Sequence, residues 1–307
     1  RTEDQAGAKL SEALYATAFV ANPYHNPIIG WMDDLEHLKV EDVKAWHARW
    51  YAPNNATMVV TGDVDAKQVL SLAQKYFGSI ARKDLPVVNP QTEPLQEGQR
   101  HVIVKAPAEN PMVLLAFKAP SLRDVEKDDD VHALDVLAAV LDGYDNARLP
   151  AKLVRTDRVA NSAGASYSNN ARGPSLFILD GSPAVGTSTA QMETLLRAEV
   201  ERIARDGVSE QELARVKTQL IASQIYKRDS IFGQAMEIGV MEMTGISYRQ
   251  IDRIIEKLGQ VTARQVQAVA RKYFNDDQLT VATLVPLPLS DKKPAAPSAS
   301  DAGAALR

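Results

Sequence analysis

The chain repeats one pattern: residues 41–62 read EDVKAWHARWYAPNNATMVVTG, and residues 264–285 read RQVQAVARKYFNDDQLTVATLV. An offset of 223 residues places Val43 on Val266, and the two stretches then match without a gap. Each stretch is typical of an amphipathic helix, a turn rich in Asn and Asp, and an apolar strand. The recurrence of this unit indicates a duplicated domain with a period of roughly 220 residues.

The two copies are preceded by unequal lengths of chain. More than 160 residues, counted from His101, precede the second copy, whereas 40 precede the first. We therefore expect roughly 120 residues of the first domain to lie upstream of Arg1. Three prolines without periodicity indicate a linker after the first copy, and a tail rich in Pro, Ala and Ser is expected to be disordered. The expected organisation is a first-domain remainder at 1–82, a linker at 83–99, a second domain at 100–286 and a tail at 287–307.

The pattern of apolar residues predicts the class α+β, with antiparallel sheets flanked by helices and the first domain incomplete. Ser209 and Glu212 are spaced as a capping box at the start of one helix. The helix at 63–78 is expected to bury a face made of Val69, Leu70, Leu72, Ala73 and Phe77. Strands are expected at 56–61, 101–105, 112–118, 160–168, 175–180 and 279–284, and further helices at 6–19, 33–37, 128–141, 189–205, 209–227, 231–243, 249–258 and 262–274.

Composition excludes several classes of function. The formal charge of −4 is small for a chain of this size, and the Lys and Arg are spread along the sequence, which argues against a nucleic-acid partner. No apolar run approaches the roughly 20 residues that a membrane-spanning helix needs. The chain has no cysteine, so disulfides and cysteine-ligated zinc are excluded.

One short motif has the spacing of a metal site. Asp33 and His37 stand one helical turn apart with Glu36 between them. A zinc site on a helix uses this spacing, although both ligands are normally histidines. The alternative, which we favour, is that Asp33 caps a short helix and the other two form a solvated surface pair. No catalytic or metal-binding residue is therefore assigned within this chain.

Two ordered segments carry a family resemblance: residues 22–30 read NPYHNPIIG, and residues 50–64 read WYAPNNATMVVTGDV. With Leu38-x-Val40-Glu-Asp-Val43 between them, they make the chain resemble the pitrilysin or insulinase-type zinc metallopeptidases, also called inverzincins. The bacterial two-domain branch is the most similar, and the resemblance covers about residues 10–286.

This resemblance implies a fold and a metal centre. Two homologous α+β domains would face each other across a cavity. Zinc would be bound by a His-x-x-Glu-His helix and a later glutamate, all in the first domain, with the motif glutamate activating water. No His-x-x-Glu-His occurs in this sequence. The chain is thus expected to be a fragment that lacks the zinc site, with zinc held in the parent protein by ligands upstream.

The resemblance also implies substrate-binding residues in the second domain. An arginine and a tyrosine seven residues later hold the substrate backbone in active members of the family. Arg155 fits the arginine, whereas Ser162 stands at the tyrosine position. Tyr167 is a candidate to take over from a neighbouring position. For Arg155 the alternative is an interdomain or surface ion pair.

The expected function is that of one part of a zinc-dependent endopeptidase that degrades or processes peptides in an enclosed chamber. This chain would supply substrate-binding walls and would be inactive alone. One alternative is a non-catalytic homologue that acts as the binding or assembly partner of an active subunit, and another is an unrelated α+β binding module. The expected partners are peptide or unfolded polypeptide and a second pitrilysin-like subunit in a homo- or hetero-dimer. Analogy with exported relatives favours the periplasm.

Overall fold

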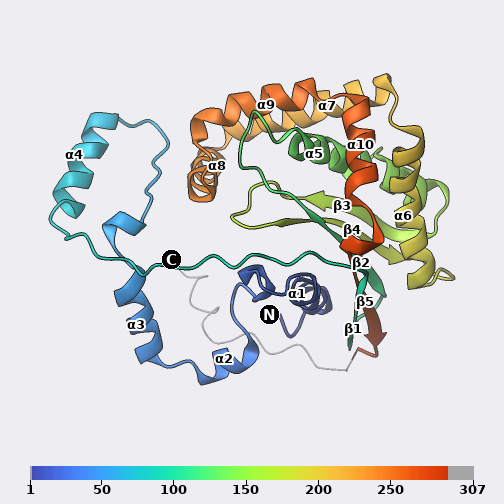
Figure 1. Ribbon diagram of the computed structural model, residues 1–307, viewed down its shortest axis with the longest axis horizontal. Helices are drawn as coiled ribbons and strands as arrows, with labels where there is room; N and C mark the ends of the chain where they lie inside the picture. The colour runs from blue at the N-terminus through green and yellow to red at the C-terminus, as the bar shows by residue number, and fades with distance from the viewer. Residues whose placement is uncertain (1, 290–307) are drawn as a thin grey trace, which may run out of the picture.

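A five-stranded sheet organises the chain, for which the computed structural model describes residues 2–289 (Figure 1). The strand order is β1-β5-β2-β4-β3, and three of the four pairings are antiparallel. The fourth, between β1 and β5, is parallel, because β5, the last strand within residues 2–289, inserts between the first two. The α+β class is confirmed, and the sheet is mixed where an antiparallel one was expected. The strands are β1 (Arg100–Pro107), β2 (Met112–Ala119), β3 (Ala160–Tyr167), β4 (Ser175–Pro183) and β5 (Leu279–Leu287).

Helices cover one face of this sheet and enclose the main core. Phe117 of β2 and Leu179 of β4 are buried there against Leu137, Val200 and Val266 of three helices. The helices between β2 and β5 agree with the predicted ranges within a few residues. They are α5 (Asp129–Asp142), α6 (Thr189–Asp206), α7 (Glu210–Tyr226), α8 (Ile231–Thr244), α9 (Ile251–Gln260) and α10 (Ala263–Tyr273), with a π-helical segment η3 (Pro150–Thr156).

The opposite face of the sheet is covered by α1 (Ala6–Ala18). Leu10 and Leu14 are fully buried against Leu114 and Ala116 of β2 and Ala282 of β5. The side chains of β2 that alternate with Leu114 and Ala116 point to the other face of the sheet, into the main core. A strand buried on both faces reads as a continuous apolar run, which explains the uninterrupted apolar stretch at 112–117. The predicted domain boundaries stay a prediction, but α1 packs on the sheet that follows the linker.

The duplicated unit is visible in the secondary structure. Both copies form a helix followed by a short 3₁₀ turn: α3 (Val40–Trp50) with Pro53–Asn55, and α10 with Asp276–Gln278. Every one of these bounds is separated from its counterpart by the predicted 223 residues.

The strand predicted at 56–61 is absent, whereas its counterpart lies within β5. A strand needs a neighbour to pair its backbone N–H and C=O groups. β5 lies between β1 and β2, but no strand lies beside residues 56–61 in the described part of the chain.

The buried face predicted for the following helix, α4 (Ala66–Phe77), is also wrong for this chain. Leu70 is 59% exposed and Phe77 is 52% exposed, because α4 extends away from the sheet (Figure 1). α2 (Met32–His37) and α3 likewise contain no buried residue.

The predicted capping box at the start of α7 is half formed. Ser209 accepts from the backbone N–H of Glu212, but the Glu212 carboxylate turns away to Arg148. Arg148 donates through Nε and Nη2 at 2.8 and 2.7 Å, and the two side chains are 20% and 17% exposed. In this half-buried position the charge-assisted pair with Arg148 is stronger than the hydrogen bond that the Glu212 carboxylate would make to the backbone N–H of Ser209.

We expect Glu212→Gln to lower the free energy of unfolding by about 1–2 kcal/mol, because it weakens a bidentate pair and leaves the guanidinium of Arg148 half-buried without its counter-charge. Urea denaturation at pH 7 measures the change. Glu210→Gln is the matched control, because this exposed glutamate lies on the same first turn of α7. Equal losses in the two variants would contradict the prediction.

Candidate functional site

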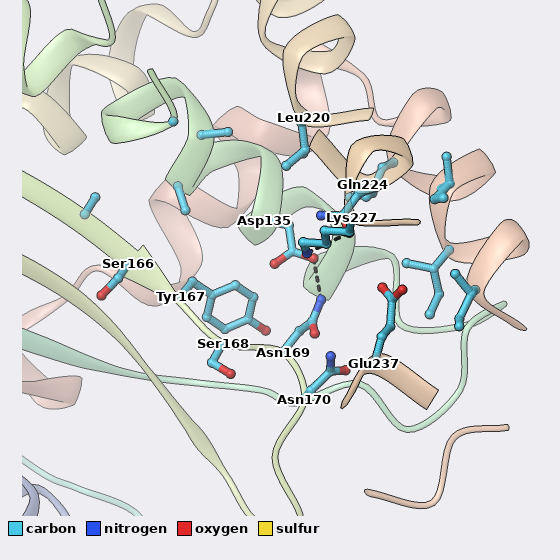
Figure 2. A pocket seen from close by; sticks show the side chains of 18 of the residues that line it. Asp135, Ser166, Tyr167, Ser168, Asn169, Asn170, Leu220, Gln224, Lys227 and Glu237 are labelled. Carbon is cyan, nitrogen blue, oxygen red and sulfur yellow. Dashed lines mark hydrogen bonds between the residues drawn. The ribbon is translucent and has the colours of Figure 1, made fainter. Parts of the chain in front are cut away.

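A cleft of about 440 Å³ lies beside the end of β3, between α5, α7, α8 and α9 (Figure 2). One wall is apolar, formed by Leu220 of α7, Met241 of α8 and Ile254 of α9. The other wall is polar, with Asp135 and Asp142 of α5 facing residues 166–170. Two turns of helix separate the two aspartates, which places them on one face of α5. A pocket with an apolar body and a few convergent polar groups is the usual form of a ligand site.

Asp135 occupies the centre of the polar wall. Its Oδ2 atom accepts a hydrogen bond from the Asn169 amide (Figure 2). Burial raises the pKa of the Asp135 carboxyl to about 7, against the opposing influence of Asn169 and the ammonium of Lys227. Its Oδ1 atom has no hydrogen-bond partner within residues 2–289. The carboxyl therefore keeps one oxygen available toward the cleft.

Tyr167 forms the floor of the cleft next to Asp135 (Figure 2). Its ring stacks on Phe177 with the centroids 5.8 Å apart, and its hydroxyl donates to the Pro120 carbonyl at 2.6 Å. Burial, followed by the charge of Asp135, raises the pKa of the phenol well above its ordinary value. Tyr167 is thus a neutral group whose proton is committed to the backbone.

The edge of the sheet closes one end of the cleft. β3 is the last strand, and the Asp142 carboxylate accepts from the Ala165 N–H at 3.2 Å. A Cβ on Gly164 would lie 2.8 Å from Asp180 Oδ1 and 2.9 Å from Asp142 Oδ2, so a larger residue here would displace these two carboxyl groups. Burial raises the pKa of both aspartates, because the charged form loses hydration there.

The three predicted substrate-binding residues lie in different places. Arg155, at the end of η3, is exposed and donates to Asn146 Oδ1 at 2.9 Å, and no ion pair to it is found in the described part of the chain. Ser162 is exposed on β3 opposite Ser182. Tyr167 is five residues further along the strand, which places it on the other face. Of the three, Tyr167 alone lines the cleft, and their role in substrate binding stays a prediction.

The sequence reasoning missed Asp135, Asn169 and Glu237, which line the same cleft. For Asp135 a signal was present, since it interrupts the apolar run at 133–137, whose other members are all buried. A carboxyl in such a position is rarely buried without a partner or a role.

The motif with metal-site spacing is a surface pair on α2. The side chains of His37 and Asp33 are 75% and 90% exposed, and His37 Nδ1 lies 2.7 Å from the Asp33 carbonyl. Among residues 2–289, no three His, Cys, Asp or Glu side chains lie close enough together to hold a metal ion. Within the same residues, no helix has the length and apolar character that crossing a bilayer requires.

A model of the family described as "Peptidase M16 inactive domain" matches residues 37–220, which is more than half of the chain. The chain belongs to the peptidase M16 family. This confirms the resemblance to pitrilysin-type metallopeptidases. The match includes β1 to β4 and α5, which carries the two aspartates of the cleft.

Known M16-like proteins agree with this assignment. The Helicobacter pylori protein named zinc protease PqqE is 29% identical over 300 residues, covering 93% of this chain and 64% of that protein. A crystal structure of a protease from Helicobacter pylori superposes with a TM-score of 0.86 at 26% identity, over 93% of this chain and 68% of the other. The periplasmic protease PqqL from Escherichia coli shares the fold, with a TM-score of 0.77 at 16% identity, over 98% of this chain and 34% of the other. The chain thus spans less than two thirds of the length of the curated relative.

Proposed function

We propose that this chain is the peptide-binding, non-catalytic part of an M16 zinc endopeptidase that processes peptides in an enclosed chamber. The observation that carries the proposal is the cleft beside β3 in a domain of the inactive type. β3 has a neighbour on one side only within the described sheet, and an extended peptide can pair with such an edge. The cleft would then receive a side chain of that peptide.

The residues of this chain fit binding better than catalysis. The described side chains include no cluster that could hold zinc, and the exposed pair on α2 lacks a third ligand. The donor set therefore does not fit a resident zinc ion, and no chemical step through zinc is assigned to these residues. In the proposed enzyme the metal belongs to a part of the protein outside this chain.

Exposed apolar side chains support the presence of further polypeptide in the complete protein. A hollow of about 780 Å³ is lined by Trp46, Trp50 and Phe77 together with Met243 of α8. Such a surface is costly to leave in water and marks a contact with protein. We infer that the remainder of the first domain covers it, in keeping with the greater length of the curated relative. A second M16 subunit is the other candidate.

Arg155 provides a test of substrate binding in the full-length protein. Arg155→Ala is expected to lower kcat/KM for peptide cleavage by roughly one to two orders of magnitude, because a charged hydrogen bond to substrate contributes about 1.5–3 kcal/mol. Steady-state kinetics on a fluorogenic peptide measure the loss. Arg158→Ala, an exposed arginine three residues away, is the control. Unchanged kinetics for Arg155→Ala would identify it as a structural residue that holds Asn146.

The second candidate is a non-catalytic homologue that assembles with an active subunit. The serine at position 162 favours it, because the phenol expected there is absent. Zinc content and peptide cleavage of the full-length protein distinguish the two: stoichiometric zinc with cleavage supports the endopeptidase, and zinc-free, inactive protein supports the homologue. A periplasmic location stays a prediction, to be tested by cell fractionation.

A further inference from the structure

We propose that the cleft receives a basic side chain of the bound peptide, with the cationic head at Asp135 and the aliphatic stem against the apolar wall. The inference rests on the proposed function, since it names the kind of peptide that the cleft selects. It concerns residues that no sequence motif pointed to.

The charges on the cleft wall favour a cation. Asp135, Asp142 and Glu237 carry carboxyl groups, whereas Lys227 is the single basic residue among the described lining residues. Lys227 donates to Gln224 at 2.9 Å, so its ammonium is already engaged. An anionic ligand would meet three carboxyl groups of like charge, which disfavours its binding.

The geometry of Asp135 gives the cation a specific partner. Asn169 holds Oδ2, which fixes the plane of the carboxyl, and Oδ1 is left without a partner within residues 2–289. Figure 2 shows the carboxyl between the side chains of Tyr167 and Lys227. A guanidinium or ammonium at this point would satisfy the unpaired oxygen through a charge-assisted hydrogen bond.

The apolar wall of the cleft can bind the aliphatic stem of such a basic side chain. Leu220, Met241 and Ile254 lie across from the carboxyl groups. Arginine and lysine bury their methylene stems on apolar surface while the charged head finds polar partners. A metal ion would gain nothing from contact with apolar side chains, and no cluster of metal ligands occurs among the described residues. A purely apolar side chain would leave the Oδ1 atom of Asp135 without a hydrogen-bond partner.

Protonation gives the proposed contact a signature. The pKa of Asp135, about 7, means that the carboxyl is largely protonated below neutral pH. An arriving cation stabilises the carboxylate, so binding releases this proton to solvent and strengthens as the pH rises from 6 to 8. The other titratable groups that face the site are Asp142 and Glu237, whose charge also attracts a cation, with Lys227, which opposes it, and neutral Tyr167.

The test compares two peptides on the 307-residue chain: acetyl-Ala-Ala-Arg-Ala-Ala-amide and the same peptide with citrulline in place of arginine. Citrulline keeps the shape of arginine and removes the charge. Titration calorimetry at pH 8 is expected to give a Kd for the arginine peptide roughly 10-fold lower or more, as one charged hydrogen bond implies. Repeating the titration in buffers of different ionisation enthalpy should show the proton release near pH 7.

Asp135→Asn is expected to remove the preference for arginine, so that the two peptides bind the variant with similar Kd values. The asparagine keeps an oxygen for Asn169, and circular dichroism checks that the variant is folded. Glu109→Gln is the control, an exposed glutamate between β1 and β2 and outside the cleft, which should behave as wild type. Equal binding of the two peptides to wild type would overturn the inference and leave the proposed function standing. No binding of either peptide at millimolar concentration would overturn both.

Discussion

Glu93→Gln is expected to lower the free energy of unfolding by about 3 kcal/mol at pH 7, because it breaks a buried charge pair that also holds a turn of backbone. The carboxylate accepts from the N–H groups of Val20, Ala21 and Asn22 at 2.9–3.1 Å and pairs with Lys118 of β2. The side chains of Glu93 and Lys118 are 7% and 14% exposed. Burial lowers the pKa of Lys118, so its ammonium depends on Glu93 for compensation.

The effect of Glu93 has a defined pH window. Burial raises the pKa of Glu93, but the hydrogen bonds from Lys118 and the backbone outweigh it and hold the pKa at about 2, against an ordinary value of 4.5. Because the pKa is lower in the folded state, the stabilisation is complete above pH 4.5 and is lost as the pH falls toward 2. Glu93→Gln should lack this dependence.

Urea denaturation of wild type and Glu93→Gln between pH 2 and pH 7 measures both effects. Glu97→Gln, an exposed carboxylate in the same segment, serves as the control and should differ from wild type by less than about 0.5 kcal/mol. If Glu93→Gln is as stable as this control at pH 7, the ion pair and the backbone hydrogen bonds of Glu93 contribute nothing to stability.

Asp135→Asn is expected to stabilise the fold at pH 8 by about 2–4 kcal/mol, the reverse of the usual effect of a buried substitution. The pKa of the carboxyl is about 7 in the folded chain and 3.8 ordinarily, and burial is the main cause. Because the folded state holds the proton more tightly, the wild-type chain loses stability as the pH rises from about 4 through 7. The asparagine does not titrate and avoids this loss.

Thermal unfolding of wild type and Asp135→Asn at pH 4 and pH 8 tests the prediction. The two proteins should be equally stable at the lower pH and diverge at the higher one. Asp145→Asn, an exposed aspartate just after α5, should show no such divergence. A variant that is destabilised by the same amount at both pH values would contradict the prediction.

Much of the fold could be predicted because its signals are local. The apolar run predicts β2, and the helical spacing of apolar residues predicts α5 to α10. The sequence repeat predicts α3 and the turn that follows it. The strand at 56–61 and the apolar face of α4 could not be judged the same way, since their state depends on a neighbour that the described chain does not provide.

The candidate site was less predictable, because it is assembled from distant segments. Asp135 comes from α5, Asn169 follows β3, and Glu237 belongs to α8, so no short motif joins them. Tyr167 was found through a family resemblance and not from its surroundings. Its orientation, away from Ser162, follows from strand periodicity once the bounds of β3 are known.

The position of Glu93 has a mechanical consequence. After α1 the chain makes the excursion that contains α2 to α4 and returns along residues 83–99. Glu93, in the returning segment, binds the backbone at 20–22, where the excursion begins, and also Lys118 of β2. The start and the end of the excursion are thus joined to each other and to β2 at this junction. The excursion is also fastened to α8, since the Thr61 hydroxyl donates to the Ile231 carbonyl at 2.9 Å, so a load on α2 to α4 is shared between this contact and the junction at Glu93.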